Sequence, residues 1–196
     1  WLRQGEIEAE DIVTGSYDEK VFADAVSYAR TLTLANPEEF VPKLKRSFAK
    51  AGVVLLFVPE LPSMGVSGAT RWLTPSKALI QVTLRYKTND HLWFTIFHES
   101  CHILKHQKRV VYLETNGKKS ADELEADAFS ANHLIPPGAF RSFVEADSFE
   151  ADDIEEFADQ IGISPAIVVG RLQREGIVAW VSPLNSMKVK FEWVTS

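Results

Sequence analysis

The chain has 196 residues, 45% of them hydrophobic and 24% charged, which is enough for one domain with a substantial core and too little for two independent enzymes. No apolar run approaches the roughly 18 residues of a membrane-spanning helix, so the sequence predicts no membrane span. The net charge of −6 argues against nonspecific nucleic-acid binding, and the single cysteine, which cannot form an internal disulfide, favours the reducing cytoplasm.

Residues 1–17 are polar and acidic with little periodicity, and they indicate a linker or a short packed arm. The chain begins at Trp1 without Met and without the basic and apolar regions of a secretory signal. We therefore expect a further domain before it. The sequence divides into this arm, a core at 18–145 and a helical C-terminal subdomain at 146–196 that packs on the core.

Apolar periodicity predicts two helices and then three strands, at 18–34, 37–52, 53–58, 66–73 and 78–84. Asp18 is the expected N-cap of the first helix, and Pro42 either kinks the second helix or delays its start. The turn sequence Thr74–Lys77 joins the last two strands as a hairpin. The predicted fold class is α+β, with a small mixed or antiparallel three-stranded sheet whose candidate edge strand is 66–73.

A helix at 89–104 carries the motif HExxH, with His98, Glu99 and His102 at its fixed positions. At about 100° per residue the two histidines lie one turn and roughly 40° apart, so both rings can bind one ion while Glu99 reaches a water molecule. Apolar residues surround the helix on nearly all sides, which predicts that it is buried. Zinc in a hydrolytic site normally takes three protein ligands, so a third must come from elsewhere.

Two sequence patterns could supply the third ligand. The metzincin pattern needs Gly at position 105 and His at position 108, where this chain has Lys105 and Lys108. The next predicted helix offers Glu123 and Glu125 instead. On the helical wheel Glu123 shares a face with Asp127 and with small or apolar residues, whereas Glu125 lies about 200° away on the polar side. The spacing therefore favours Glu123 as ligand, with Asp127 hydrogen-bonded to one of the two histidines.

The remainder of the chain is predicted to be mainly helical, with helices at 122–135, 140–144, 151–160 and 166–175. Other expected segments are a short apolar run at 110–113, a mobile loop at 114–120 and strand-like pieces at 177–181 and 189–194. The last two helices have the cadence of a helix-turn-helix. Acidic residues crowd the first of them and only Arg171 and Arg174 are basic on the second, so we predict a structural role and no DNA reading.

The two motifs together resemble the ImmA/IrrE family of metallopeptidases. The likeness lies in the segment Phe94–His106 around HExxH and in the segment Glu123–Pro136, and it covers about residues 50–140 well. Cys101 stands where that family commonly has Gly.

The resemblance implies a zincin-like fold, with zinc bound by His98, His102 and Glu123 and with Glu99 as general base. It also implies a protein substrate, a DNA-binding repressor or antitoxin whose cleavage switches on phage, mobile-element or stress genes. The chain is similar to the branch that carries an N-terminal Xre-type helix-turn-helix domain, as in HigA-like antitoxin regulators. Through such a domain the whole protein would bind DNA.

A hydrolytic zinc site usually has a further donor for the oxyanion. The sequence leaves five candidates open: His106, His133, Tyr112, Tyr86 and Arg71. Cys101 lies about 60° from His98 on the wheel, which suggests a Cys/His nucleophile. That interpretation is the weaker one, because a cysteine on a buried helix is usually a small apolar filler.

Two functions compete on these observations. The first is a zinc-dependent endopeptidase of narrow specificity, which the intact Glu99 favours. The second is a non-proteolytic transcriptional regulator or antitoxin in which the same fold senses a ligand or partner, which Cys101 and the expected DNA-binding domain favour. The sequence leaves the oligomeric state open.

Overall fold

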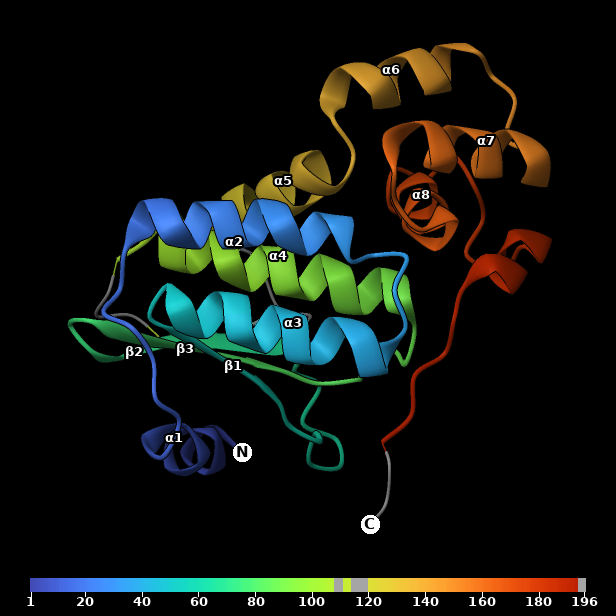
Figure 1. Cartoon of the computed structure of the whole chain (residues 1–196). Helices are drawn as coiled ribbons and strands as arrows, with labels where there is room; N and C mark the ends of the chain where they lie inside the picture. The colour runs from blue at the N-terminus through green and yellow to red at the C-terminus, as the bar shows by residue number, and fades with distance from the viewer. Residues whose placement is uncertain (108–110, 114–119, 194–196) are drawn as a thin grey trace.

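The computed structural model describes residues 1–107, 111–113 and 120–193 (Figure 1). These residues form an α+β fold in which helices pack on both faces of a small mixed sheet, and the predicted fold class is confirmed to this extent. Parts of the predicted segments at 110–113, 114–120 and 189–194 fall outside the described residues. Within the described ranges, none of the helices combines the length and the apolar character needed to cross a membrane.

The described residues contribute four strands to one sheet, in the order β1-β3-β2-β4. Their bounds are Val53–Phe57 for β1, Gly68–Thr74 for β2, Lys77–Val82 for β3 and Tyr112–Leu113 for β4. β1 runs parallel to β3, whereas β2 is antiparallel to both β3 and β4. The sheet is therefore mixed, one of the two predicted alternatives, and the predicted β2–β3 hairpin is confirmed.

The prediction that segment 66–73 forms an edge of the sheet is wrong. β4 pairs with β2 through Ala69 with Leu113 and Thr70 with Tyr112, which places β2 inside the sheet at these residues. A strand of two residues is too short to give a recognisable alternation of apolar and polar positions, so the sequence predicted only three strands.

Every residue of β1 is apolar because both faces of this strand are covered. Successive residues of a strand face opposite sides of the sheet. Val53 and Leu55 belong to the main core, whereas Val54 and Leu56 belong to a second cluster together with Ala9.

A helix at the N-terminus covers this second face. α1 (Leu2–Glu10) packs against β1 and β3 and lies on the opposite side of the sheet from α2, α3 and α4 (Figure 1). On β3, the Lys77 ammonium donates hydrogen bonds to the carbonyls of Ala9 and Ile12, each at 2.7 Å. The sequence predicted a linker or a short packed arm here and did not identify the helix, because α1 buries only Gly5 and Ala9 and so has little apolar periodicity.

The helices on the main side of the sheet begin where side chains cap them. The carboxylate of Asp18 accepts a hydrogen bond from Val21 N at 2.9 Å and caps α2 (Glu19–Thr31), as predicted. α3 (Pro37–Lys50) begins at Pro37 and contains Pro42 in its interior, so the alternative of a later start is wrong.

The HExxH segment forms the central helix of the molecule, α4 (Asn89–Lys105). α4 contacts β2 and β3 on one side and the helices α2, α5 and α8 on the others, and the prediction that it is buried is confirmed. α5 (Ala121–Leu134) begins at the N-cap Ser120, whose hydroxyl oxygen accepts from Glu123 N at 3.3 Å. This cap fixes the first turn of α5 beside α4.

Three further helices follow, α6 (Pro137–Glu145), α7 (Ala151–Ile161) and α8 (Pro165–Arg174). α6 is longer than predicted, and Gly162 ends α7 with a φ of +68°, a left-handed conformation that glycine adopts without strain. α8 packs against both α7 and α4.

The predicted strands at 177–181 and 189–194 are wrong for the residues that the structure describes. A 3-10 helix, η1 (Pro183–Met187), follows α8. The tail after it, residues 188–193, makes an isolated β-bridge between Lys190 and Thr88. The tail finds its partners at the start of α4, where Asn89 N donates to Val189 O at 2.9 Å and Val189 N donates to the Asn89 side chain at 3.0 Å. The backbone groups of Val189, which a strand would pair in a sheet, are thus engaged with the first residue of α4.

Candidate metal centre

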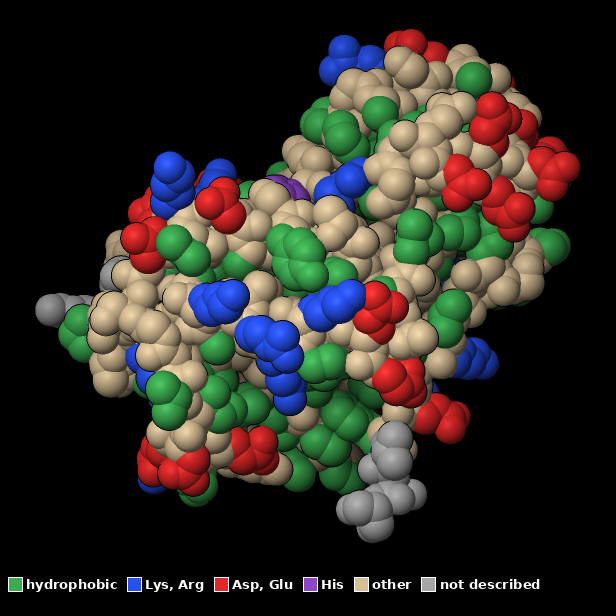
Figure 2. Space-filling view, viewed as in Figure 1, with side chains coloured by type: hydrophobic (Ala, Val, Ile, Leu, Met, Phe, Trp, Pro, Cys, Tyr) green, Lys and Arg blue, Asp and Glu red, His purple; other side chains and the backbone are tan. Residues whose placement is uncertain are grey.

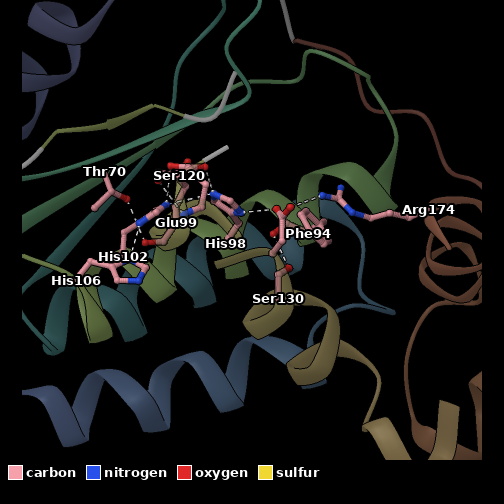
Figure 3. A network of polar contacts seen from close by, with 11 residues as sticks. Thr70, Phe94, His98, Glu99, His102, His106, Ser120, Ser130 and Arg174 are labelled. Atoms are coloured by element: carbon pink, nitrogen blue, oxygen red, sulfur yellow. Dashed lines mark hydrogen bonds and ion pairs between the residues drawn. The ribbon is translucent and has the colours of Figure 1, made fainter. Parts of the chain in front are cut away.

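The histidines of α4 lie one turn apart and face each other. His98 Nε2 is 3.2 Å from His102 Nε2, and both side chains are buried. α4 is fixed against α5 one turn earlier, where the Ser130 hydroxyl donates to the carbonyl of Phe94 at 2.8 Å. The helical spacing and this contact together present both ring nitrogens to α5 (Figure 3).

Glu123 reaches the histidine pair from the first turn of α5. Its two carboxylate oxygens lie 3.0 Å from His98 Nε2 and 3.4 Å from His102 Nε2. One ligand atom from each of the three residues falls within 4.8 Å of the others, and no second group of this kind occurs among the described His, Cys, Asp and Glu residues. The two nitrogens and one carboxylate are close enough to hold a metal ion.

The protonation of these side chains follows from their surroundings. Burial alone would raise the pKa of Glu123, but hydrogen bonds with His102 and His98 outweigh it and lower the pKa from 4.5 to about 2. Burial lowers the pKa of His102 below its ordinary value of 6.5, although the hydrogen bond to Glu123 opposes this. Near neutral pH the site therefore contains an ionised carboxylate and a neutral His102.

Each histidine has a partner on its other ring nitrogen. His98 Nδ1 is 3.1 Å from an oxygen of Asp127, and the second oxygen of that carboxylate accepts from the Arg174 guanidinium at 2.7 Å. His102 Nδ1 is 2.7 Å from His106 Nδ1. Such outer contacts fix the tautomer and the ring orientation of a ligand histidine.

Glu99 is fully buried between α4 and β2. The backbone carbonyl of Glu99 accepts a hydrogen bond from the Thr70 hydroxyl at 3.1 Å. Figure 3 shows Glu99 beside the two histidines. A Cβ atom at Gly68 would lie 2.5 Å from Glu99 Oε1. β2 can therefore pack this closely on Glu99 only because position 68 has no side chain.

Two of the five oxyanion candidates lie next to the ligands. The ring of Tyr112 stacks on His102 with centroids 4.1 Å apart, and its hydroxyl donates to Asp122 at 3.0 Å. His106 lies behind His102, at the Nδ1 side, with its own Nε2 3.5 Å from Glu125. This position makes His106 a partner of a ligand histidine and turns it away from Glu123.

The structure does not bring the other three candidates to the site. Arg71 forms an ion pair with Glu6 of α1, on the far side of the sheet, because it is one residue out of phase with Thr70 on β2. Tyr86 stacks on His91 at 4.2 Å, near the start of α4. The third, His133, packs at the other end of α5 between the rings of Phe97 and Phe129.

Cys101 is buried and lies outside the group of potential metal ligands. Burial raises the pKa of its thiol from 9.0 to about 12, so the thiol is neutral near physiological pH. A neutral thiol is a poor nucleophile, and the weaker interpretation of a Cys/His nucleophile loses support.

Sequence reasoning missed Gly68, Thr70 and the role of Arg174. The first two lie about 30 residues before Glu99, on a strand whose register against α4 no local pattern encodes. Arg174 was visible only as a basic residue on α8, 47 positions from Asp127. Contacts at this separation depend on the tertiary fold.

An α+β fold with a histidine pair on a buried helix and a carboxylate from the next helix defines a metallopeptidase-like domain. The family model of peptidase M78, the IrrE N-terminal-like domain, matches residues 56–173, and the chain belongs to this family. The matched segment includes His98, His102 and Glu123 and ends one residue before Arg174. A comparison with curated proteins gives no significant match.

Proposed function

We propose that the protein is a zinc-dependent endopeptidase of narrow specificity with a zincin-like site. One observation carries the proposal: the ligand atoms of His98, His102 and Glu123 lie within 4.8 Å of one another on two packed helices. Two histidines and a glutamate are a donor set that zinc takes in hydrolytic enzymes.

The protonation states also suit zinc, because a metal ligand needs a free lone pair. The lowered pKa of His102 keeps that ring neutral, and the pKa of about 2 keeps Glu123 ionised. The contact of Asp127 with His98 Nδ1 leaves Nε2 as the nitrogen that faces Glu123. The three side chains are therefore already placed for the metal, which would displace the proton shared between the histidine nitrogens and Glu123.

Zinc held by these residues would supply Lewis acidity, which polarises a carbonyl and makes water more acidic. Glu99 is the general base that takes a proton from the attacking water and passes it to the leaving amine. Among the oxyanion candidates we retain Tyr112, because its ring lies against His102. Its hydroxyl donates to Asp122 in this structure and would have to turn from that carboxylate to donate to the oxyanion.

We extend the proposal to the substrate, a DNA-binding repressor or antitoxin protein whose cleavage changes gene expression. Membership of the M78 family supports a peptidase role. The net charge of −6 suits a basic partner, because complementary charge speeds association and disfavours other partners.

The test is a cleavage assay with the full-length protein and the proteins encoded beside it. We expect one zinc-dependent cut, and Glu99→Gln should bind zinc with unchanged affinity while cutting about 100-fold or more slowly. Glu125→Gln, on the exposed side of α5, is the matched control and should cut at the normal rate. Undiminished cleavage by Glu99→Gln would exclude Glu99 as the base. Zinc binding without any cut by the unaltered protein would favour the non-proteolytic regulator.

A further inference from the structure

A single carboxylate links α8 to the candidate metal ligands. Asp127 offers one oxygen to His98 Nδ1 at 3.1 Å and the other to Arg174 Nη2 at 2.7 Å. Figure 3 shows the Arg174 side chain extending from the end of α8 towards the helices that carry the site. Both oxygens of Asp127 are thus engaged, each with a residue from a different helix.

The guanidinium of Arg174 is also held on its face. It lies over the ring of Phe94, 4.3 Å from the ring centroid. Phe94 is one turn before His98 on α4, and its carbonyl accepts the hydrogen bond from Ser130 of α5. Three helices therefore meet around Asp127. α5 carries Asp127 itself, α4 carries His98 and Phe94, and α8 carries Arg174.

This arrangement has a consequence for His98. A carboxylate whose second oxygen is paired with a guanidinium is restrained from rotating, so its first oxygen stays in place as a hydrogen-bond acceptor for His98 Nδ1–H. The Nδ1 side of His98 is then held on Asp127, which leaves Nε2 as the nitrogen that faces Glu123 and would bind the ion. Without Arg174 the carboxylate of Asp127 could turn towards solvent, because its side chain is 17% exposed.

We propose that Arg174 is a positioning residue of the metal site, acting through Asp127 on His98, and that the docking of α8 on α4 thereby sets the metal affinity. The inference rests on the metal-binding part of the proposed function and not on cleavage. It gives the C-terminal helices a role in the site, although Arg174 lies beyond the segment that the family model matches.

α8 does not depend on Arg174 to stay in place. Its residues Ile167, Val168, Val169 and Leu172 are buried in the main core. The Lys188 ammonium bonds both the Gln173 side chain and the Asp90 carboxylate at 2.7 Å, which ties α8 to the start of α4. The Arg174 side chain is 41% exposed, so its removal leaves no large cavity.

The test measures zinc affinity by competition with a chromophoric chelator, on the full chain and with zinc alone as the probe. Arg174→Ala should bind zinc about 3- to 10-fold more weakly. Arg171→Ala is the matched control one turn earlier on α8, where the guanidinium pairs with Glu175, and it should stay within about twofold of the unaltered protein. Equal affinity of Arg174→Ala and the unaltered protein would overturn the proposal.

A double-mutant cycle separates positioning from a general loss of structure. In the Asp127→Ala background, the further change Arg174→Ala should have no effect on zinc affinity, because the group that transmits it is gone. If the two substitutions lowered the zinc affinity independently, so that their effects added, Arg174 would act by a route other than Asp127. That result would contradict the proposal. The d–d absorption of bound Co²⁺ should change for Arg174→Ala, be partly restored in Arg174→Lys and be unaltered in Arg171→Ala.

The outcomes remain distinct from those of the proposed function. An unaltered protein that binds zinc and cuts no protein would favour the non-proteolytic regulator over the endopeptidase, while the effect of Arg174→Ala on zinc affinity would still be measurable. A lower unfolding temperature of metal-free Arg174→Ala, with unchanged zinc affinity, would show a purely structural role and overturn the inference.

Discussion

Glu123 and Glu125 lie two positions apart on α5, about 200° around the helix, and their carboxylates meet different neighbours. Glu123 contacts both candidate ligand histidines, whereas Glu125 pairs with Lys105 at 3.0 Å and is about half exposed. We predict that Glu123→Ala abolishes measurable zinc binding. Glu125→Ala should change the affinity by less than about threefold, since exposed ion pairs contribute little.

Zinc titration in competition with a chelator measures both variants. The contact of Glu125 with His106, at 3.5 Å, is the route by which a small effect could reach His102. A Glu125 variant that loses the metal while the Glu123 variant keeps it would show that the register of α5 is wrong by half a turn.

The buried thiol of Cys101 gives a second prediction at this scale. With a pKa of about 12, the thiolate fraction at pH 8 is roughly one in ten thousand, and the side chain is inaccessible. Iodoacetamide should therefore modify the native protein very slowly and the denatured protein rapidly, as followed by mass spectrometry. Rapid modification of the native protein would restore the interpretation of a reactive cysteine.

Local spacing predicted the side chains that approach one another within one helix or one motif. The i, i+4 relations between His98 and His102 and between Glu123 and Asp127 follow from helix geometry alone. The sequence could not predict which carboxylate oxygen meets which histidine, nor that Arg174 would engage Asp127. Those contacts depend on how α5 and α8 dock on α4.

The packing of β2 on α4 depends on Gly68. An added Cβ would meet Glu99 Oε1 at 2.5 Å and Glu99 Cγ and Thr95 Cγ2 at 2.8 Å. The φ of Gly68 is not in the left-handed region, so the strand backbone at this position is compatible with alanine. The expected cost of the substitution is therefore steric. We predict that Gly68→Ala lowers the free energy of unfolding by about 1–3 kcal/mol and slows any cleavage.

Denaturant unfolding with the control Gly138→Ala tests this prediction. No atom lies within 4 Å of a Cβ built at Gly138, in the first turn of α6, so that change should be neutral or stabilising by up to about 1 kcal/mol. A Gly68→Ala protein as stable as the Gly138→Ala protein would show that β2 and α4 separate without cost.

At the scale of elements, long periodic segments were predictable and short ones were not. α2, α4 and α5 have apolar faces over three or more turns, and the sequence predicted each of them. α1 and β4 bury too few residues to produce a pattern. The continuous apolar run of β1 did contain a signal for α1, because a strand that is apolar on both faces requires a cover on each side of the sheet.

The helices of the C-terminal part belong to the same core as the rest of the molecule. Ile154 and Phe157 of α7 and Leu172 of α8 are in one hydrophobic cluster with Phe40 and Trp93. The sequence predicted a subdomain that packs on the core, and periodicity alone could not show that the two would share buried residues. Such continuity indicates that α7 and α8 stabilise the helix that carries the site.

The helix-turn-helix cadence of α7 and α8 therefore has a structural explanation, and we predict that residues 1–196 do not bind duplex DNA. The face of α8 that a reading helix would place in a groove is packed inside the molecule, and its two arginines are engaged with Glu175 and Asp127. Figure 2 shows acidic side chains in the region of α7, whose exposed acids are Asp152, Glu155, Glu156 and Asp159. Phosphates would be repelled by this surface.

Fluorescence anisotropy with a labelled duplex should show no binding at about 50 mM salt, and binding that weakens steeply towards about 200 mM would contradict the prediction.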